Sequence, residues 1–469
     1  MRFANTAGAL AAAALMTGLF ASPAARAQSP APSGPTGFLF DQGAPLAPVG
    51  QTLADYGVYV KGFFTDILYG VPSGGLQNTT VLYNEAFYGL DIDLNKAVGI
   101  PGAVFHVSLD SRWGGLDQGV NNLTGFSEGF LAGSGPDNNT RLTEFSYDQH
   151  LYNDKLRFVF GRTQLASYFA TSDLYCQFVS SICSNMVPLN WSANSNAPFF
   201  PIATWAGELA VYPTPDTYAR VGASLSDPTQ YPHAGMPWDG GWGVRGPSGV
   251  YTPIEIGYVT HAGETRYPGH YDVGFYHDSS QFADPQYNTT GGKLALVGGT
   301  PLMHDGQSGF YFQAQQTLWK PDPAGSRDIW GFVGGMFAAS PYSFVQSYWE
   351  AGLVAHGPFA LRPNDNAGIL YTHYTFNPRQ TGSVDDRFTA EGIAANVSND
   401  SDLVEINYGF AIAPGISFKP FVDLTFHPDQ NIFDIPNPRQ GVNFALGTGG
   451  QLFILLNPAL GLPSFFREN

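Results

Sequence analysis

Polar and charged residues recur at every second position of several short segments, and this spacing is the main chemical feature of the chain. Side chains of a β-strand alternate between two faces, so such segments carry charged groups on one wet face and apolar groups on the other. Segment 103–112 is an example, and segments 155–161 and 404–410 repeat the pattern. In segment 103–112 the apolar members are Phe105, Val107 and Leu109, and the polar members are His106, Ser108, Asp110 and Arg112. With lipid on one side and water on the other, such segments predict a pore and not a catalyst.

The sequence contains no catalytic or cofactor motif. HExxH, a Walker loop, a GxSxG elbow and a GxGxxG between strand and helix are all missing. The ten His are scattered, without a second His at metal-ligand spacing. Asp91 and Asp93 share one segment and could in principle serve glycoside hydrolysis, but we interpret them as wet-face residues. A barrel-borne lipid hydrolase is a weaker alternative because no triad is recognisable. We therefore predict that the protein is not an enzyme and has no cofactor.

The composition also favours a membrane barrel. Charged residues make up 13% of the chain, against about 25% in soluble domains, yet the mean hydropathy is only −0.09. An apolar outer band excludes charge while lumen and loops need polar groups, and the 14% aromatic content fits aromatic girdles at both interfaces. The net charge of −17 argues against a nucleic-acid partner. A large secreted β-sandwich or propeller is the alternative that composition leaves open.

The ends of the chain predict export. Arg2, a short apolar stretch and the small-x-small site Ala25-Arg26-Ala27 predict a signal peptide over residues 1–27. Residues 28–50, rich in Pro, Gly, Ser and Ala, predict a flexible periplasmic lead-in. Because no later run of eighteen apolar residues occurs, a membrane helix is excluded. We predict one barrel domain over residues 51–456 and a C-terminal tail over residues 457–469.

Alternation bounded by turn residues predicts sixteen strands, the first from about Leu53 and the tenth from about Gly309. Asn153-Asp154 and Pro414-Gly415 predict tight turns. Other connections are long, and they are 113–139, 164–200, 227–250 and 375–400. The expected fold is therefore all-β, a transmembrane antiparallel β-barrel of about 16 strands with short periplasmic turns and long extracellular loops. A barrel of that size encloses an aqueous channel.

Three blocks resemble the OprB family of carbohydrate-selective porins. They are Arg141–Arg162 with Tyr168-Phe169 and Cys176-Gln-Phe178, then Pro414–Asp423 with His427-Pro428, and Tyr83–Leu94 with Gly99–Asp110. The resemblance implies a sixteen-stranded barrel that passes sugars across the bacterial outer membrane. One feature departs from such barrels, which usually close on a strand with a terminal aromatic residue: here residues 457–469 follow the last predicted strand.

A pore for neutral sugars needs loose binding by aromatic rings and by charged groups that bond hydroxyls. Opposed acidic and basic groups on adjacent strands would set a transverse field across the lumen. We predict that the constriction and sugar-binding residues are Asp110, Arg112, Trp113, Glu144, Arg157, Arg162, Tyr168 and Phe169. The alternative is that they are lumen-wall ion pairs that support the barrel.

The connection 164–200 is too long to be a plain link in a compact wall. It carries aromatic residues around Cys176 and Cys183, which predict one disulfide in an oxidising compartment. We predict that this loop folds into the mouth or lumen, with the disulfide at its tip. The alternative is an external cap that stiffens the rim.

The predicted function is passive, carbohydrate-selective diffusion through the outer membrane. The expected partners are neutral mono- or disaccharides, outer-membrane lipid and lipopolysaccharide, and the sequence does not distinguish a monomer from a homotrimer. The rival hypothesis is a secreted soluble sugar-binding or sugar-hydrolysing β-sandwich. Solubility without detergent would distinguish the rival from a barrel.

Overall fold

The structure is a computed structural model that describes residues 38–39, 43–115, 119–126, 139–180, 194–198, 200–226, 249–261, 265–393, 397–428 and 442–465. Alternating sequences with turn residues between them form sixteen strands in this part of the chain. The first eight are β1 (Val58–Gly74), β2 (Thr80–Asp93), β3 (Ala103–Gly114), β4 (Asn139–Leu151), β5 (Leu156–Thr163), β6 (Thr204–Thr214), β7 (Thr217–Ser226) and β8 (Gly249–Thr260). The other eight are β9 (Gly269–Asn288), β10 (Pro301–Trp319), β11 (Asp328–Ala338), β12 (Val345–His356), β13 (Asn366–Phe376), β14 (Asp400–Ala413), β15 (Ile416–Phe426) and β16 (Phe444–Leu455).

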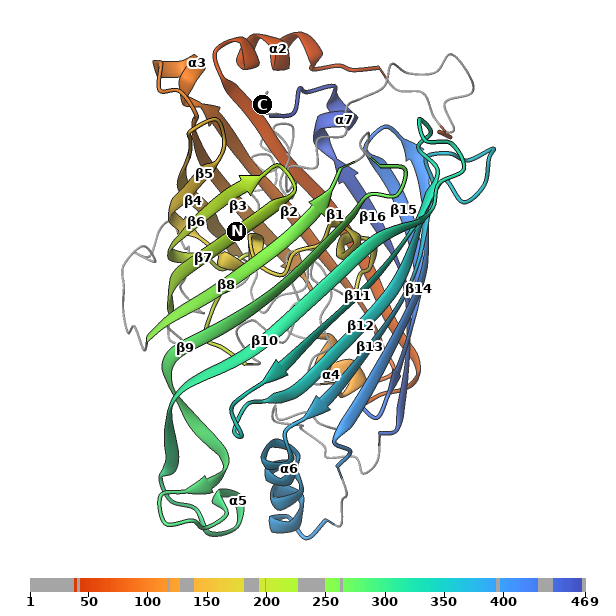
Figure 1. Cartoon of the computed structure of the whole chain (residues 1–469). Helices are drawn as coiled ribbons and strands as arrows, with labels where there is room; N and C mark the ends of the chain where they lie inside the picture. Colours follow the sequence, from red (N-terminus) through yellow and green to blue (C-terminus); the bar gives the residue numbers. More distant parts are fainter. Residues whose placement is uncertain are drawn as a thin grey trace, which may run out of the picture.

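Each strand pairs with its sequence neighbours, and β1 pairs antiparallel with β16 to close the barrel (Figure 1). Ten pairs of directly opposite residues join these two strands, from Phe63–Leu455 to Gly74–Ala445. Closure leaves no sheet edge unpaired, which a strand protein in a membrane requires. The predicted sixteen-stranded antiparallel barrel is confirmed.

The short helices lie at the two ends of the barrel (Figure 1). They are α2 (Ala47–Asp55), α3 (Leu94–Val98), α4 (Val120–Thr124), α5 (Leu294–Val297), α6 (Pro378–Ala390) and α7 (Leu456–Leu460). The 3₁₀ turns η1 (Leu165–Ser167) and η2 (Asp173–Gln177) belong to the connection between β5 and β6. None of the helices within the described ranges is long and apolar enough to cross a membrane.

Two strand starts differ from the prediction. Leu53 belongs to helix α2, which has Pro48 in its first turn, and β1 begins only at Val58. The tenth strand begins at Pro301 and not near Gly309, because β9 and β10 are 20 and 19 residues long and extend as a hairpin beyond their neighbours (Figure 1). The extra length of β10 mixes apolar and polar residues, and its exposed Leu302 and Met303 are consecutive, so it does not show the lipid-facing alternation from which the prediction was made.

The tight turns lie at one end of the barrel and the long connections at the other, as predicted. The turn between β4 and β5 holds Tyr152, Asn153 and Asp154 at φ 56°, 56° and 60°, and Gly415 turns β14 into β15 at φ 72°. A positive φ favours Asn, Asp and Gly. These tight turns lie at the end that also holds α2 and α7, whereas α4, α5 and α6 follow the longer connections at the opposite end (Figure 1). Comparison with barrels of known topology assigns the tight turns to the periplasmic side.

The two faces of the wall differ as the alternation predicts. Ile256, Phe310 and Ile406 are 56%, 56% and 50% exposed on the outer face. Their sequence neighbours Glu255 and Glu405 are 2% and 0% exposed on the inner face. The apolar side chains therefore face outward, as a lipid-facing surface requires, and the polar ones face the interior.

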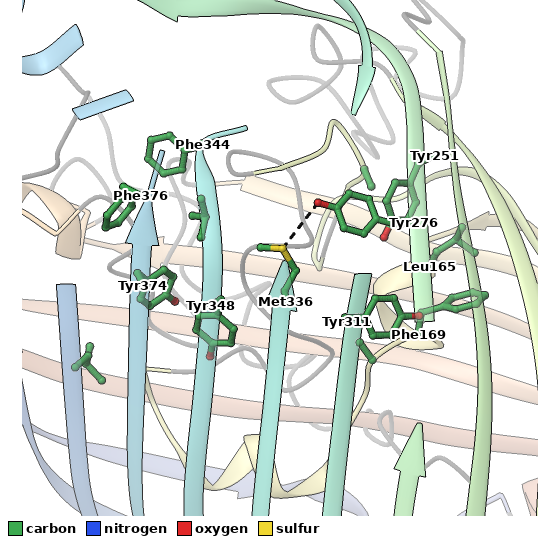
Figure 2. Close-up of a cluster of buried hydrophobic side chains, with 14 of the residues drawn as sticks. Leu165, Phe169, Tyr251, Tyr276, Tyr311, Met336, Phe344, Tyr348, Tyr374 and Phe376 are labelled. Carbon is green, nitrogen blue, oxygen red and sulfur yellow. Dashed lines mark hydrogen bonds between the residues drawn. The ribbon is translucent and has the colours of Figure 1, made fainter. Parts of the chain in front are cut away.

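The described residues of the predicted loop 164–200, which are 164–180, 194–198 and 200, lie inside the barrel. For these residues the predicted inward loop is confirmed and the external cap is not. Leu165 and Phe169 pack into a buried cluster with Tyr311, Tyr251 and Met336 of the wall (Figure 2). Figure 2 shows these loop residues beside β10, with Tyr276 directed at the Met336 sulfur. The loop therefore fills part of the lumen against the wall and narrows the space that remains. Helix α4 also packs inward, because Val120 and Leu123 join a cluster with residues of β1, β2 and β15.

Candidate channel lining

A continuous row of acidic and basic side chains crosses the inner faces of nine adjacent strands. We call this row the charge belt. Its members, from β1 to β9, are Lys61, Asp91, His106, Asp148, Arg157, Glu208, Arg220, Glu255, His270 and Asp272. Each lies at an inward position of its strand, so the two-residue period brings one or two members per strand to the lumen.

Contacts link the belt members in order from the first strands. Lys61 Nζ lies 2.5 Å from Asp91, and His106 contacts Asp91 at 2.6 Å and Asp148 at 3.9 Å. Arg157 then joins Asp148 at 2.8 Å to Glu208 at 3.4 Å. Because every acid has a basic neighbour on an adjoining strand, these contacts hold six strands, β1 to β6, in register.

The belt continues on the next strands through Arg220. Its Nε lies 4.0 Å from Glu208 and 3.5 Å from Glu255. The Tyr218 hydroxyl contacts both Glu255 at 2.9 Å and His270 at 2.8 Å, and His270 lies 3.3 Å from Asp272. Gln313 of β10 donates to Asp272 at 2.6 Å and ends the row.

Burial separates the two signs within the belt from β3 to β9, whereas in the first pair the side chains of Lys61 and Asp91 are 2% and 10% exposed. Four basic side chains are 15%, 18%, 13% and 19% exposed, and they are His106, Arg157, Arg220 and His270. Four acidic side chains are only 8%, 0%, 2% and 0% exposed, and they are Asp148, Glu208, Glu255 and Asp272. From β3 to β9 the carboxylates therefore lie beneath the bases. The surface that meets water presents hydrogen-bond donors whose charge is compensated from below.

A second group surrounds Arg112, nearer the end of β3 that leads into the long connection. Arg112 contacts Glu85 at 2.7 Å and Asp110 at 3.0 Å, and its guanidinium lies 5.4 Å from the Phe200 ring. Phe200 also packs against Phe87 at 5.7 Å. A guanidinium beside aromatic rings combines donors with apolar surface, as predicted for a site that binds sugars.

Buried carboxylates of the wall hold the backbone of the inward loop. Glu255 accepts from the Ala170 N–H at 2.7 Å, and Asp278 accepts from the Asn196 N–H at 2.7 Å. Glu405 accepts from the N–H groups of Val179 at 3.1 Å and Ser180 at 2.8 Å. Loop amides inside a barrel lose contact with water, so they need protein acceptors. These three carboxylates supply them.

Four predicted residues lie on the inner wall, and they are Asp110, Arg112, Glu144 and Arg157. Asp110 is 1% exposed behind Arg112. Glu144 accepts from Lys61 at 3.4 Å and from Ser146 at 3.0 Å, which places it beside the belt. Tyr168 of the loop covers Arg157, with 5.1 Å between guanidinium and ring centre. Whether these residues control sugar passage stays a prediction.

Three other predicted residues lie elsewhere. Trp113 is on the outer face, 40% exposed and packed against Phe64 at 6.0 Å, so its predicted place in the constriction is wrong. It follows Arg112 directly, and consecutive side chains of a strand point to opposite faces. Arg162 is 0% exposed and donates to the Ala203 carbonyl. Phe169 is 2% exposed in the loop–wall cluster. Arg162 and Phe169 thus support the loop and do not line open channel.

Cys176 lies in η2, but Cys183 is outside the described residues, and the predicted disulfide stays a prediction. Within the described ranges, no three His, Cys, Asp or Glu side chains gather in a way that could hold a metal ion. Sequence reasoning left several belt members out of the candidate site, among them Glu208, Arg220, Glu255 and Asp272. These residues could have been recognised in the sequence, because each is a charged residue at an alternate position of an otherwise apolar segment.

A closed sixteen-stranded barrel with an apolar exterior, a charged inner wall and an inward loop defines the class of outer-membrane diffusion channels. The family model "Carbohydrate-selective porin, OprB family" matches residues 79–448. The chain belongs to this family, which is one of channels, and it lies in the bacterial outer membrane.

Individual relatives agree with this assignment. Porin B of Pseudomonas aeruginosa is 25% identical over 299 residues, which cover 62% of this chain and 64% of Porin B, less than two thirds of its length. The high-pH structure of Pseudomonas putida OprB superposes with a TM-score of 0.74 and 20% identity, over 86% of this chain and 96% of that chain. The low-pH structure of the same protein gives a TM-score of 0.52 and 17% identity, over 86% and 94%. Both structures show that the fold is shared.

Proposed function

We propose that the protein is a passive channel for small neutral sugars, with the charge belt and the Arg112 group as its selective wall. The observation that carries the proposal is the layering of partly exposed bases over buried acids. A guanidinium offers five donors to hydroxyl groups, while the acid beneath offsets its charge. A hydroxyl-rich neutral solute is thus bound by donors without strong attraction for anions.

The position of the inward loop supports a narrow path along this wall. Described loop residues bond to inner positions of the opposite strands: Ser172 to Gln315 and Gln177 to Asn407, each at 2.5 Å, and Tyr175 to Gln313 at 3.0 Å. These contacts hold part of the loop against the β10–β14 side, while Tyr168 and Phe200 lie over Arg157 and Arg112. We propose that solutes pass along the wall that these two arginines line. Loose binding there suits transport, because a site of about millimolar affinity corresponds to only about 4 kcal/mol.

The outer surface of the barrel supports the predicted contacts with outer-membrane lipid and lipopolysaccharide. Its apolar side chains suit acyl chains, and we infer that the rim with the long connections meets lipopolysaccharide. We also propose that Cys176 and Cys183 form a disulfide, that residues 28–50 are a periplasmic lead-in, and that residues 457–469 are a C-terminal tail. A secreted sandwich would pack its apolar faces into a solid interior, and the closed barrel gives no support to that rival.

Liposome swelling tests the proposal with solutes of similar size. Proteoliposomes should swell faster in glucose than in gluconate at equal osmolarity, since the compensated wall favours the neutral solute. Swelling no faster than in protein-free liposomes would refute channel function. Faster swelling in gluconate would refute the proposed selectivity for neutral sugars and leave the channel itself standing.

A further inference from the structure

One carboxylate lies on the outer surface of the barrel, at the middle of its strand. Asp66 is the central residue of the 17-residue strand β1, which runs the length of the barrel (Figure 1). Its neighbours Thr65 and Ile67 are 2% and 0% exposed on the inner face. The Asp66 side chain therefore points outward, between the outward side chains of Phe64 and Leu68.

The residues that pair with Asp66 place it midway between the two membrane interfaces. A row of directly opposite residues crosses five strands of the outer wall, and it consists of Phe418, Leu452, Asp66, Asn84 and Trp113. Phe418 follows the tight periplasmic turn at Gly415, and Trp113 lies at the end of β3 that leads into a long connection. Because the strands of a barrel tilt, such a row rises from one interface to the other. Asp66 is central in this row and therefore lies near the bilayer midplane.

The position of Asp66 calls for a protein partner outside its own chain. Its Oδ1 atom is buried and has no hydrogen-bond partner among the described residues. A carboxylate in contact with hydrocarbon is costly, and ionisable residues within membrane spans almost always meet other protein groups. Lipid headgroups lie at the interfaces and do not reach the midplane. The outer surface around Asp66 is therefore a surface that another protein covers.

Hydrogen-bond donors lie beside Asp66 at outward positions of the next three strands. Asn84 donates one amide N–H to the Trp113 carbonyl at 3.1 Å, and its second N–H has no partner in the described part of the chain. A chain of three hydroxyl groups, with distances of 3.0 and 2.8 Å, is formed by Tyr88, Ser111 and Thr140. Three hydroxyl groups that share two hydrogen bonds leave one O–H to donate elsewhere. We call these residues the outer polar patch, and its members are Asp66, Asn84, Tyr88, Ser111 and Thr140.

We propose that the outer polar patch packs against the same patch of a second copy of this chain, about a two-fold axis along the membrane normal. In a two-fold contact the same residues meet from both sides, so an acceptor of one copy faces donors of the other and the reverse. Asp66 of each copy then accepts from Asn84 or from the hydroxyl chain of its partner. Because the patch holds both acceptor and donors, it complements itself. Gly62 and Ala86, at outward positions beside the patch, allow close approach of the two walls.

The contact leaves each channel unobstructed. The outer polar patch lies on the outside of β1 to β4, whereas the charge belt lies on the inner faces of the same strands. Asp66 is also opposite Leu452 of β16, so the second copy covers the closure of the barrel. This inference concerns assembly and does not depend on sugar passage.

Photo-crosslinking of the full chain in intact outer membranes tests the contact. Benzoylphenylalanine in place of Leu82, which is 44% exposed beside the patch, should give a product of two chains. The same group in place of Val273, 52% exposed on β9 at the opposite side of the barrel, should not. Asp66→Leu should lower the yield from position 82 at least tenfold, because each copy loses its charge-assisted hydrogen bonds. Asp402→Leu, which removes an outward carboxylate at the extracellular end of β14, should retain the yield.

Heat-dependent migration on SDS gels checks that each variant is folded. Absence of a two-chain product from position 82 would overturn the proposal, as would equal yields from positions 82 and 273. An unchanged yield in folded Asp66→Leu would also overturn it. A product that joins position 82 only to lipopolysaccharide or to a different protein would show that something else covers the patch. A three-chain product would indicate a head-to-tail contact, and either result refutes the two-fold pairing.

Discussion

Arg112 and Trp113 are adjacent in the sequence and lie on opposite surfaces of the wall. Arg112 contacts Glu85 and Asp110 on the inner face, and Trp113 packs on Phe64 of the outer face. The two residues therefore separate a role in solute passage from a role in the membrane surface. A pair of conservative substitutions can measure this difference directly.

We expect Arg112→Lys to weaken sugar block of the single-channel current, while Trp113→Phe leaves it unchanged. Lysine keeps the charge next to Glu85 but loses the planar fork of donors. Loss of one hydrogen bond worth about 0.5–1.5 kcal/mol lowers apparent affinity roughly two- to tenfold. Equal effects of both substitutions would contradict the assignment of the two faces.

At the scale of elements, the inward loop depends on wall carboxylates for its position. Glu255 accepts from Ala170 of the loop and from the hydroxyls of Tyr218 and Tyr311 at 2.9 and 3.0 Å. It also lies 3.5 Å from Arg220. One carboxylate thus joins the loop to three strands, so its neutralisation should release the loop more than it disturbs the barrel.

We expect Glu255→Gln to lower the free energy of unfolding by about 1.5–3 kcal/mol, the range for hydrogen bonds to charged groups. It should also increase open-channel current noise as the loop moves. Urea unfolding and single-channel recording measure the two effects. Asp305→Asn, at an exposed position of the β9–β10 hairpin, is the matched control, and similar noise in both variants would refute the anchoring role.

The periplasmic turn between β12 and β13 is held by Asp365. Its carboxylate accepts from Arg362 at 2.7 Å, from the Ala411 N–H at 2.9 Å and from Tyr408 at 2.7 Å. Burial raises the pKa of Asp365, but these hydrogen bonds and the charge of Arg362 outweigh it and lower the pKa below its usual value. A lowered pKa stabilises the folded state above the unfolded pKa, and this contribution is lost as pH falls through the folded value.

Asp365→Asn should therefore destabilise the barrel by about 1–3 kcal/mol at pH 7. The difference from the wild type should shrink below about pH 4, the usual range for an aspartate. Urea unfolding at several pH values tests this expectation. Asp322→Asn in the exposed β10–β11 turn is the control, and a pH-independent difference for Asp365→Asn would exclude the ionised carboxylate as the cause.

At the scale of the whole molecule, the outer surface defines the protein as a membrane barrel. Ile254 is 47% exposed between the buried inner residues Tyr251 and Glu255 of the same strand region. Tyr258 and Tyr271 stack at 6.5 Å near the periplasmic end of the outer wall. Exposed aliphatic residues with aromatic residues near the ends are typical of a lipid-facing band.

Ile254→Arg should cost about 2–4 kcal/mol in lipid vesicles, as expected for a cation near the bilayer midplane. Val297→Arg, at an exposed position of the β9–β10 hairpin region, should stay within about 0.5 kcal/mol of the wild type. Unfolding titrations in vesicles compare the two variants. Equal stability would show that Ile254 does not face lipid.

Local signals predicted the wall closely and the site only in part. The turn residues Asn153, Asp154 and Gly415 marked two hairpins, and the two-residue period assigned inward and outward faces to most strands. Arg162 and Phe169 escaped this reasoning because residues 164–203 have no period, and their burial depends on strands far along the chain. Glu255 holds Ala170 across 85 positions of sequence, a contact that no local pattern encodes.

The sequence by itself determined that sixteen amphipathic strands close into a barrel, since side-chain alternation and turn chemistry are properties of neighbouring residues. Only the tertiary structure decided which inward charges meet, because strand register and the path of the loop set those distances. The charge belt exists only once neighbouring strands pair in the register that sets these inward side chains next to one another.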